Sequence, residues 1–237
     1  MRDVSTHFSW AHEKYLESIL ETNKLWYENI NRILNPLLKG VMLDIGNGGV
    51  LTYDAGLLRE VLAVDVSFKD ISKLKKRANL KYIRDDARTL CLIKPNSVDI
   101  ALFQLVLHHI TGRTRKETFD NVRASLRAAM RVLRPGGRII IVETAVPAAV
   151  EVIEAGSYFL SELLLKILNL PMVYLFSRKT INRFLKELPL SGIYSAKISY
   201  GARLDILNGL LPGRCILPSW LSIHRCWLFT GEKKWQT

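Results

Sequence analysis

The fold of this chain is decided by residues 41–49, which read VMLDIGNGG. A short apolar run there includes an acid and passes into a glycine turn, and a second apolar run, residues 61–64, ends at Asp65. A strand, a glycine turn and an acid about 20 residues further on are typical of a nucleoside-binding βαβ unit. We therefore expect two neighbouring parallel strands, residues 41–45 and 61–65.

The residues of this turn indicate which ligand it fits. The dinucleotide pattern G-x-G-x-x-G would need glycine at Leu51, so a pyrophosphate cofactor is disfavoured. Asp44 favours a ligand such as S-adenosylmethionine, which has no phosphate and carries a positive sulfonium and ammonium. Gly46 and Gly48 let backbone carbonyl oxygens approach the ammonium, and Asp65 can accept hydrogen bonds from the ribose hydroxyls. A buried strand with a tight turn and a satisfied acid is the competing interpretation.

Further motifs follow the glycine turn in a fixed order. They are VLAVDVS (61–67), YIRDDA (82–87), NSVDIALFQLVLHHI (96–110) and VLRPGGRIIIVE (132–143). Over residues 41–143 the chain resembles the class I S-adenosylmethionine-dependent methyltransferases, most closely the small-molecule group of the ubiquinone and menaquinone methyltransferases. The resemblance implies an α/β fold with a Rossmann-like, doubly wound, mostly parallel seven-stranded sheet and helices on both faces. Residues 53–56 form a poor helix, so the first helix is expected to be short or irregular.

We expect a single methyltransferase domain with four parts. They are an N-terminal helical lid (1–36), a cofactor-binding core (37–144), an apolar cap insertion after strand five (145–176) and a completion of the sheet (177–237). Residues 10–34 have helical periodicity, and Asn35-Pro36 is expected to end that helix. Its aromatic residues Trp10, Trp26 and Tyr27 either form a lid over the cofactor or pack on the sheet. Pro135-Gly136-Gly137 is expected to be the turn before strand five.

Ligands of open parallel sheets bind beyond the carboxyl ends of the strands. The candidate cofactor-binding residues at this rim are Asp44, Gly46, Asn47, Gly48, Asp65, Val66, Asp86, Ala87 and Gln104. By the resemblance, the side chain of Asp86 and the backbone N–H of Ala87 hold the adenine, although Asp86 also fits a loop-capping acid. Gln104 either contacts the cofactor or closes a loop.

The candidate catalytic residues are His108 and His109, which follow the fourth predicted strand. Imidazole titrates near neutrality, so either can act as a general base for an oxygen or carbon acceptor. Glu143 is a second candidate base, and a structural role for both histidines is the alternative. The by-product would be S-adenosylhomocysteine. No metal site is expected, because the three cysteines lack metal-ligand spacing.

The predicted insertion carries a wide apolar face. Its members are Phe159, Leu160, Leu163, Leu164, Ile167 and Leu168. An apolar cap predicts a hydrophobic small-molecule substrate or shallow membrane contact. Packing against the edge of the sheet is the competing account.

The chain of 237 residues has a net charge of +12. Four arginines line one stripe of a predicted helix over 115–133, namely Arg123, Arg127, Arg131 and Arg134. The stripe is either a solvated face or a contact for an acidic carrier protein, an anionic membrane surface or nucleic acid. No stretch is apolar enough to span a membrane, and we expect a cytoplasmic protein that is soluble or peripheral to a membrane.

Three functions are compatible with these patterns. The leading hypothesis is S-adenosylmethionine-dependent O-, N- or C-methylation of a hydrophobic acceptor such as a secondary metabolite, quinone or lipid. The second is an RNA methyltransferase that uses the basic surface. It is disfavoured because residues 103–106, FQLV, replace the acid/asparagine-Pro-Pro-aromatic motif of enzymes that methylate base amino groups. The third is a non-catalytic protein of this fold that binds an acidic partner.

Overall fold

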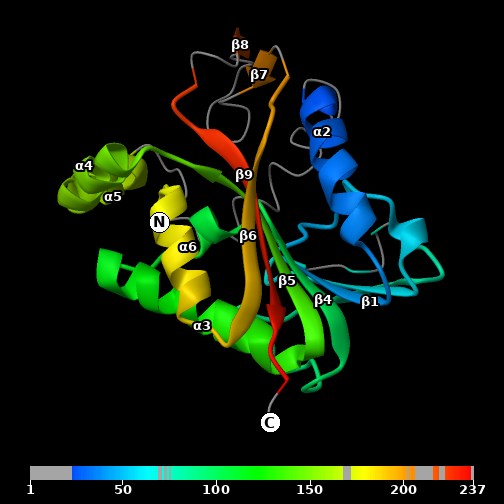
Figure 1. The fold of residues 1–237 in the computed structure, drawn as a ribbon. Coiled ribbons are helices and arrows are strands. Elements are labelled where there is room, and N and C mark those ends of the chain that lie inside the picture. Colours follow the sequence, from blue (N-terminus) through cyan, green and yellow to red (C-terminus); the bar gives the residue numbers. More distant parts are fainter. Residues whose placement is uncertain are drawn as a thin grey trace.

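The computed structural model describes residues 23–68, 71, 74, 76–167, 172–201, 203–205, 216–218 and 222–235. A seven-stranded sheet runs through the middle of the molecule, with helices on both of its faces (Figure 1). Trp10, one of the three proposed lid aromatics, lies outside the described residues.

The strand order is β3-β2-β1-β4-β5-β9-β6. The strands are β1 (Val41–Ile45), β2 (Glu60–Val64), β3 (Leu80–Ile83), β4 (Val98–Gln104), β5 (Leu133–Ala145), β6 (Leu190–Ile198) and β9 (Arg225–Lys233). The first five pair in parallel, and β9 pairs antiparallel with both β5 and β6. The predicted mostly parallel seven-stranded fold is confirmed.

Both faces of the central strands are buried. Val41 and Leu43 of β1 face one hydrophobic cluster, and Met42 between them faces the other. This follows from the two-residue period of a strand, and it explains why the central strands are apolar throughout. The first cluster includes side chains of α3 (Arg115–Val132) and α6 (Arg178–Lys186), and the second includes α2 (Lys24–Leu34). Figure 1 shows α3 and α6 on the side of the sheet opposite to α2.

Local side chains determine where the main helices begin. The Thr114 side chain accepts a hydrogen bond from the Glu117 N–H at the start of α3, and the predicted N-cap Ser177 accepts one from the Thr180 N–H at the start of α6. Short elements complete the chain: η1 (Asn35–Leu37), η2 (Ala55–Leu57), η4 (Leu107–His109), β7 (Arg203–Asp205) and β8 (Ile216–Pro218). The prediction of a short first helix is confirmed, because only η2 lies between β1 and β2.

One sequence prediction is wrong. Pro135-Gly136-Gly137 lies within β5, and is not a turn that precedes it. The register shifts between Val98 and Ile100 of β4, where Leu133 and Arg138 are their partners on β5. The motif is therefore a bulge, and Gly136 takes the left-handed φ of 75° that such a bulge needs.

The insertion forms two helices, α4 (Ala148–Gly156) and α5 (Tyr158–Ile167), which project from one side of the body (Figure 1). Four of the predicted apolar residues, Phe159, Leu160, Leu163 and Ile167, are exposed to solvent. Their exposure excludes the alternative in which these four side chains pack against the edge of the sheet.

Candidate functional site

The carboxyl ends of β1, β2 and β4 meet at one edge of the sheet. Asp44 of β1 is aligned with Ala63 of β2 on one side and with Leu102 of β4 on the other. Each strand then ends within two residues, so the glycine turn, Asp65 and Gln104 follow at the same rim. The sequence prediction placed its candidate residues at this edge, where open α/β sheets bind ligands.

The glycine turn has one packed side and one open side. Gly46 has a φ of 73°, and a Cβ there would lie 2.1 Å from Cγ2 of Val106. Gly48 has a φ of 62°, and no heavy atom lies within 4 Å of its hypothetical Cβ. Backbone of this kind admits a ligand where a side chain would stand. The turn is therefore a cradle that is open at Gly48.

Asp44 is buried directly beneath this cradle. Its Oδ2 accepts hydrogen bonds from Nδ2 of Asn47 at 2.5 Å and from Oη of Tyr53 at 2.7 Å. Burial raises the pKa of the Asp44 carboxyl from 3.8 to about 6, although the hydrogen bonds from Tyr53 and Asn47 lower it. An approaching cation would favour the ionised form, so the carboxyl suits an ammonium group.

Asp65 is held in place from two directions. Its Oδ2 accepts a hydrogen bond from the Gly48 N–H at 2.9 Å, and its Oδ1 accepts one from the Ser67 N–H at 2.7 Å. An ionised carboxylate has about four acceptor positions, so each oxygen retains capacity for a ligand hydroxyl. Asp65 thus joins the cradle to the end of β2, with the half-exposed Val66 beside it.

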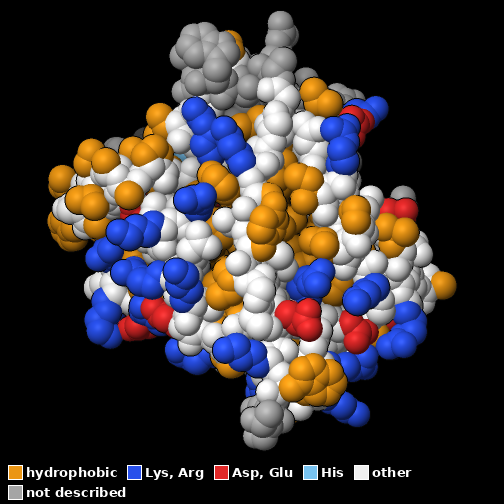
Figure 2. Space-filling view, viewed as in Figure 1, with side chains coloured by type: hydrophobic (Ala, Val, Ile, Leu, Met, Phe, Trp, Pro, Cys, Tyr) orange, Lys and Arg blue, Asp and Glu red, His pale blue; other side chains and the backbone are white. Residues whose placement is uncertain are grey.

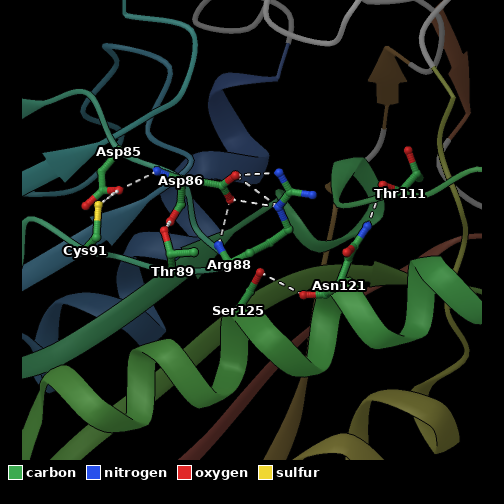
Figure 3. A network of polar contacts seen from close by, with 8 residues as sticks. All are labelled: Asp85, Asp86, Arg88, Thr89, Cys91, Thr111, Asn121 and Ser125. Carbon is green, nitrogen blue, oxygen red and sulfur yellow. Dashed lines mark hydrogen bonds and ion pairs between the residues drawn. The ribbon is translucent and has the colours of Figure 1, made fainter.

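The two acids after β3 have different roles (Figure 3). Asp85 is buried and accepts hydrogen bonds from the Asp86 N–H at 2.7 Å and the Leu92 N–H at 2.7 Å. Asp86 forms a bidentate ion pair with Arg88, whose hydrogen bonds lower the pKa of the Asp86 carboxyl. Asp86 also has the loop-capping role that the sequence suggested, because its Oδ1 accepts a hydrogen bond from the Arg88 N–H at 2.8 Å. Asp86 and the adjacent Ala87 are partly exposed on this loop, and the Asp86 carboxylate is already paired with Arg88.

Gln104 ends β4 with an unsatisfied amide. Its Nε2 is buried and has no hydrogen-bond partner among the described residues. Leu105 follows with a φ of 55°, an uncommon value for leucine, which turns the chain sharply after the strand. Buried amides without partners are rare in folded proteins and indicate a missing acceptor.

His108 and Glu143 form a pair beyond the ends of β4 and β5. Nδ1 of His108 lies 2.8 Å from Oε1 of Glu143, whose side chain is fully buried. Glu143 Oε2 also accepts a hydrogen bond from the Leu107 N–H at 2.9 Å, and Oε1 accepts one from the Thr144 N–H at 2.8 Å. A carboxylate at Nδ1 favours the tautomer that carries the proton there, so Nε2 of His108 is available as a base. The ring of His109 packs on His108 at 4.0 Å between centroids, and it is His108 whose ring nitrogen meets Glu143.

Comparison with known proteins connects this arrangement to a family. Residues 43–141, which run from β1 to β5, match the family model described as a methyltransferase domain. The structure is similar to a chain from the complex between the Haloferax volcanii Trm112 methyltransferase activator and a methyltransferase. The TM-score is 0.69 at 14% identity, covering 99% of this chain and 100% of that chain. The fold is that of a class I methyltransferase.

Two further methyltransferase structures share the fold. One is an S-adenosylmethionine-dependent methyltransferase from Thermotoga maritima, with a TM-score of 0.62, 16% identity and coverage of 96% of this chain and 99% of that chain. The other is the N-methyltransferase NodS of Bradyrhizobium japonicum in complex with S-adenosylhomocysteine, with a TM-score of 0.58, 11% identity and coverage of 96% and 98%. A search of curated proteins finds no significant match. The family match and the S-adenosylhomocysteine-bound neighbour support the expected cofactor, S-adenosylmethionine.

Sequence reasoning did not identify two residues near the rim and α2. His224 precedes β9 and lies near His108. Burial lowers the pKa of His224 most, and the nearby His108 lowers it further. Tyr200 follows β6, is buried, and packs edge-on against Trp26 of α2 at 5.1 Å between ring centroids. Both residues lie far along the chain from the glycine motif, and no local pattern identified them. Tyr53 shows the same limitation, since nothing in its own segment indicates that it donates to Asp44.

The predicted arginine stripe is largely engaged in contacts within the chain. Arg123 pairs with Glu187 at 2.7 Å, and Arg134 pairs with Asp99 at 2.7 Å. Arg131 donates to the backbone carbonyls of Ile93 and Leu90 at 3.1 and 2.6 Å. Arg127 is exposed and makes no hydrogen bond or ion pair within the described part of the chain. The stripe is therefore mainly an intramolecular clamp on α3.

Proposed function

We propose that this protein transfers a methyl group from S-adenosylmethionine to a hydrophobic small molecule, such as a secondary metabolite, a quinone or a lipid-like compound. The observation that carries the proposal is the open cradle at Gly48 with the Asp65 carboxylate fixed against it. The buried, partnerless amide of Gln104 on the same rim provides an independent polar contact. These residues fit an uncharged ribose and a cationic amino acid moiety better than a diphosphate.

Each rim residue has a definite task in this proposal. Asp65 binds the ribose hydroxyls, Asp44 and the turn at Gly46 and Asn47 face the ammonium, and Gln104 donates to the carboxylate. Asp86 and the N–H of Ala87 would bind the adenine, with Asp86 rotating away from Arg88 or sharing its oxygens with it. The bound cofactor supplies a methyl group that its sulfonium has already activated, and S-adenosylhomocysteine is the by-product.

His108 is the proposed general base. An acceptor O–H or N–H gives its proton to Nε2 of His108, and its lone pair then forms the bond to the methyl carbon. Glu143 keeps Nδ1 protonated and stabilises the imidazolium that results. His109 packs against His108 and is assigned a positioning role. A positioned base of this kind contributes about 10²- to 10⁴-fold to a rate.

The surroundings of this pair support an apolar acceptor. Trp26, Tyr27 and Tyr200 are buried in one aromatic group, with Trp26 and Tyr27 rings 5.4 Å apart between centroids. Tyr200 is near enough to Glu143 for that carboxylate to raise the Tyr200 pKa, although burial raises it more. Aromatic side chains with few polar groups are typical of pockets for hydrophobic ligands. Trp26 and Tyr27 pack with strand residues in the second hydrophobic cluster, which supports the packing alternative, and a lid role for α2 stays part of the proposal.

The cofactor proposal is tested by titration calorimetry with S-adenosylhomocysteine. We expect measurable binding that Asp65→Ala weakens by roughly 10- to 100-fold, the value of one or two hydrogen bonds to a charged group. Asp54→Ala is the matched control, because Asp54 only caps η2 through the Gly56 N–H. No binding, or equal affinities for the three proteins, would refute the cofactor site. The acceptor is sought by incubating the protein with labelled cofactor and fractionated extract, and a label confined to RNA would favour the alternative acceptor.

Protein partners are a separate part of the proposal. The similarity to a chain from a Trm112 complex motivates co-purification with a small activator protein of that kind. Only the net charge of +12 favours RNA or an acidic carrier protein as a partner. This hypothesis loses support because three arginines of the stripe make contacts within the chain. Arg127→Glu should leave methyl transfer unchanged if neither partner uses the stripe.

A further inference from the structure

The helices α4 and α5 are oriented with their apolar side chains outward. Six large apolar side chains on them are between 45% and 73% exposed: Val152, Ile153, Phe159, Leu160, Leu163 and Ile167. We call these six residues the α4–α5 apolar face. They form the hydrophobic patch at the outer end of these helices in Figure 2. Soluble proteins rarely expose contiguous apolar patches without a function.

Polar contacts hold the inner sides of the same helices. The buried Glu151 of α4 accepts hydrogen bonds from the Ser177 N–H at 3.0 Å and from Oγ1 of Thr180 at 2.8 Å. Glu154 accepts one from the Leu175 N–H at 3.1 Å. The two acids of α4 are therefore turned inward, which is the reverse of an ordinary surface helix.

The first residue of α5 is fixed in a similar way. The Tyr158 hydroxyl donates to the Gly112 carbonyl at 2.7 Å and lies 2.8 Å from Oγ1 of Thr118. The tyrosine is buried, whereas Phe159 and Leu160 beside it are exposed. Inner polar anchors thus set the orientation of both helices, and the apolar face is not produced by loose packing.

Positive charge borders the apolar face on two sides. Arg178 and Lys179 are exposed at the start of α6, beside the anchor of Glu151 to Ser177 and Thr180. Arg113 and Arg115 are exposed beside Gly112, where Tyr158 is anchored. Figure 2 shows Lys and Arg side chains next to the hydrophobic patch. An apolar face with a basic border and its acids turned inward complements an anionic lipid surface.

We propose that the α4–α5 apolar face binds the surface of an anionic lipid bilayer. Phe159, Leu160 and Ile167 enter the interface between headgroups and acyl chains, and the bordering Arg and Lys side chains contact the lipid phosphates. Neither helix is long enough to cross a bilayer, because α4 has 9 residues and α5 has 10. The contact is therefore peripheral. The exposed apolar side chains, bordered by Arg113, Arg115, Arg178 and Lys179, match an anionic lipid surface better than they match a basic protein partner.

Vesicle co-sedimentation with the whole chain tests this inference. The protein should bind vesicles of phosphatidylcholine mixed with phosphatidylglycerol more tightly than vesicles of phosphatidylcholine alone. Phe159→Glu and Ile167→Glu should each weaken binding by about tenfold or more, since each removes a large apolar side chain from the interface. Lys179→Glu should weaken binding by several-fold on the anionic vesicles only. Leu92→Glu is the matched control, because Leu92 is an equally exposed apolar residue on the loop after β3.

A second readout does not depend on how the charged variants fold. Phe159→Trp keeps the apolar character, and its fluorescence should shift to shorter wavelength and be quenched by brominated lipid when vesicles are added. Absence of vesicle binding, an unquenched tryptophan, or equal binding by Phe159→Glu and Leu92→Glu would each overturn the proposal. A dimer in the absence of lipid that Phe159→Glu dissociates would also overturn it, in favour of a second copy of the chain. These measurements require no cofactor, so they are independent of the proposed methyl transfer.

Discussion

Nδ1 of His108 lies 2.8 Å from Oε1 of Glu143, and the two residues are 35 positions apart in the chain. The pair exists because β4 and β5 are parallel neighbours, with Gln104 aligned to Val142. Glu143 follows Val142 on β5. The short helix η4, which follows β4, brings His108 within hydrogen-bond distance of Glu143. Two side chains that the sequence proposed as separate bases thus form one unit, in which the carboxylate orients the imidazole.

This pairing distinguishes the two histidines. His108→Ala should lower the rate of methyl transfer by about 10²-fold or more, because it removes the oriented base. His109→Ala removes a ring packed on His108 but keeps the His108–Glu143 pair, and should have a much smaller effect. The rates are measured with labelled cofactor and the identified acceptor, and S-adenosylhomocysteine affinity should be unchanged in both variants. Equal losses for the two variants would contradict the assignment of His108 as the base.

Gly46 and Gly48 should fail in different ways when each is replaced by alanine. Gly46→Ala places a Cβ 2.1 Å from Cγ2 of Val106 and should cost about 2 to 4 kcal/mol of stability. Gly48→Ala meets no neighbour and should cost only about 1 kcal/mol, but its methyl group occupies the open cradle and should weaken S-adenosylhomocysteine binding. Denaturant unfolding and calorimetry separate the two effects.

A double variant tests the cause of the first effect. Combining Gly46→Ala with Val106→Ala removes the closest clash, with Cγ2, and leaves the Cβ of residue 106 at 2.9 Å, so the stability lost by the pair should be less than the sum of the single losses. An additive result would show that the left-handed φ of Gly46, and not Val106, explains its requirement for glycine.

Asp44 should make stability depend on pH. The folded protein retains the Asp44 proton up to a pKa of about 6, compared with 3.8 for the free group. Its contribution to stability is therefore fully present below pH 3.8 and is lost as pH rises through about 6. The difference corresponds to on the order of 3 kcal/mol. Asp44→Asn should show a smaller fall in the free energy of unfolding over this range, whereas Asp54→Asn, at an exposed position, should follow the wild-type profile.

Arg131 and Arg127 form a matched pair on α3. Arg131→Ala removes the side-chain donor to the Ile93 carbonyl and one of two donors to the Leu90 carbonyl, and should lower the free energy of unfolding by about 1 to 3 kcal/mol. Arg127→Ala should change it by less than about 0.5 kcal/mol, as expected for an exposed side chain. A similar loss for both variants would indicate that overall charge, not the clamp on α3, accounts for the effect.

Much of the fold was accessible from the sequence because its signals are local. The apolar run of β1, the glycine turn and Asp65 lie within 25 positions, and their structure follows from strand periodicity and glycine conformation. Pro135-Gly136-Gly137 was misjudged for the same reason. Its residues favour any sharp local bend, and whether that bend is a turn or a bulge depends on how β5 aligns with β4.

The site was only partly accessible, because its pairings depend on alignment between distant segments. Asp85 and Asp86 are adjacent and chemically identical, yet one is buried against Leu92 and the other pairs with Arg88. The apolar residues of α5 were identified correctly, but a helical period does not reveal whether its apolar side faces the core or solvent. Burial of Glu151 and Tyr158 decides that question, and neither residue is unusual in sequence.

The hydrogen bonds that converge on Glu143 have a consequence for the proposed catalysis. The N–H groups of Leu107 and Thr144 belong to the backbone, so the carboxylate is immobilised when the sheet forms. The imidazole of His108 consequently loses its rotational freedom during folding, before any acceptor arrives. Fixing a side chain costs up to about 2 kcal/mol, and here that cost does not recur in each turnover. In the proposed mechanism, the acceptor meets an imidazole whose orientation was fixed before the acceptor bound.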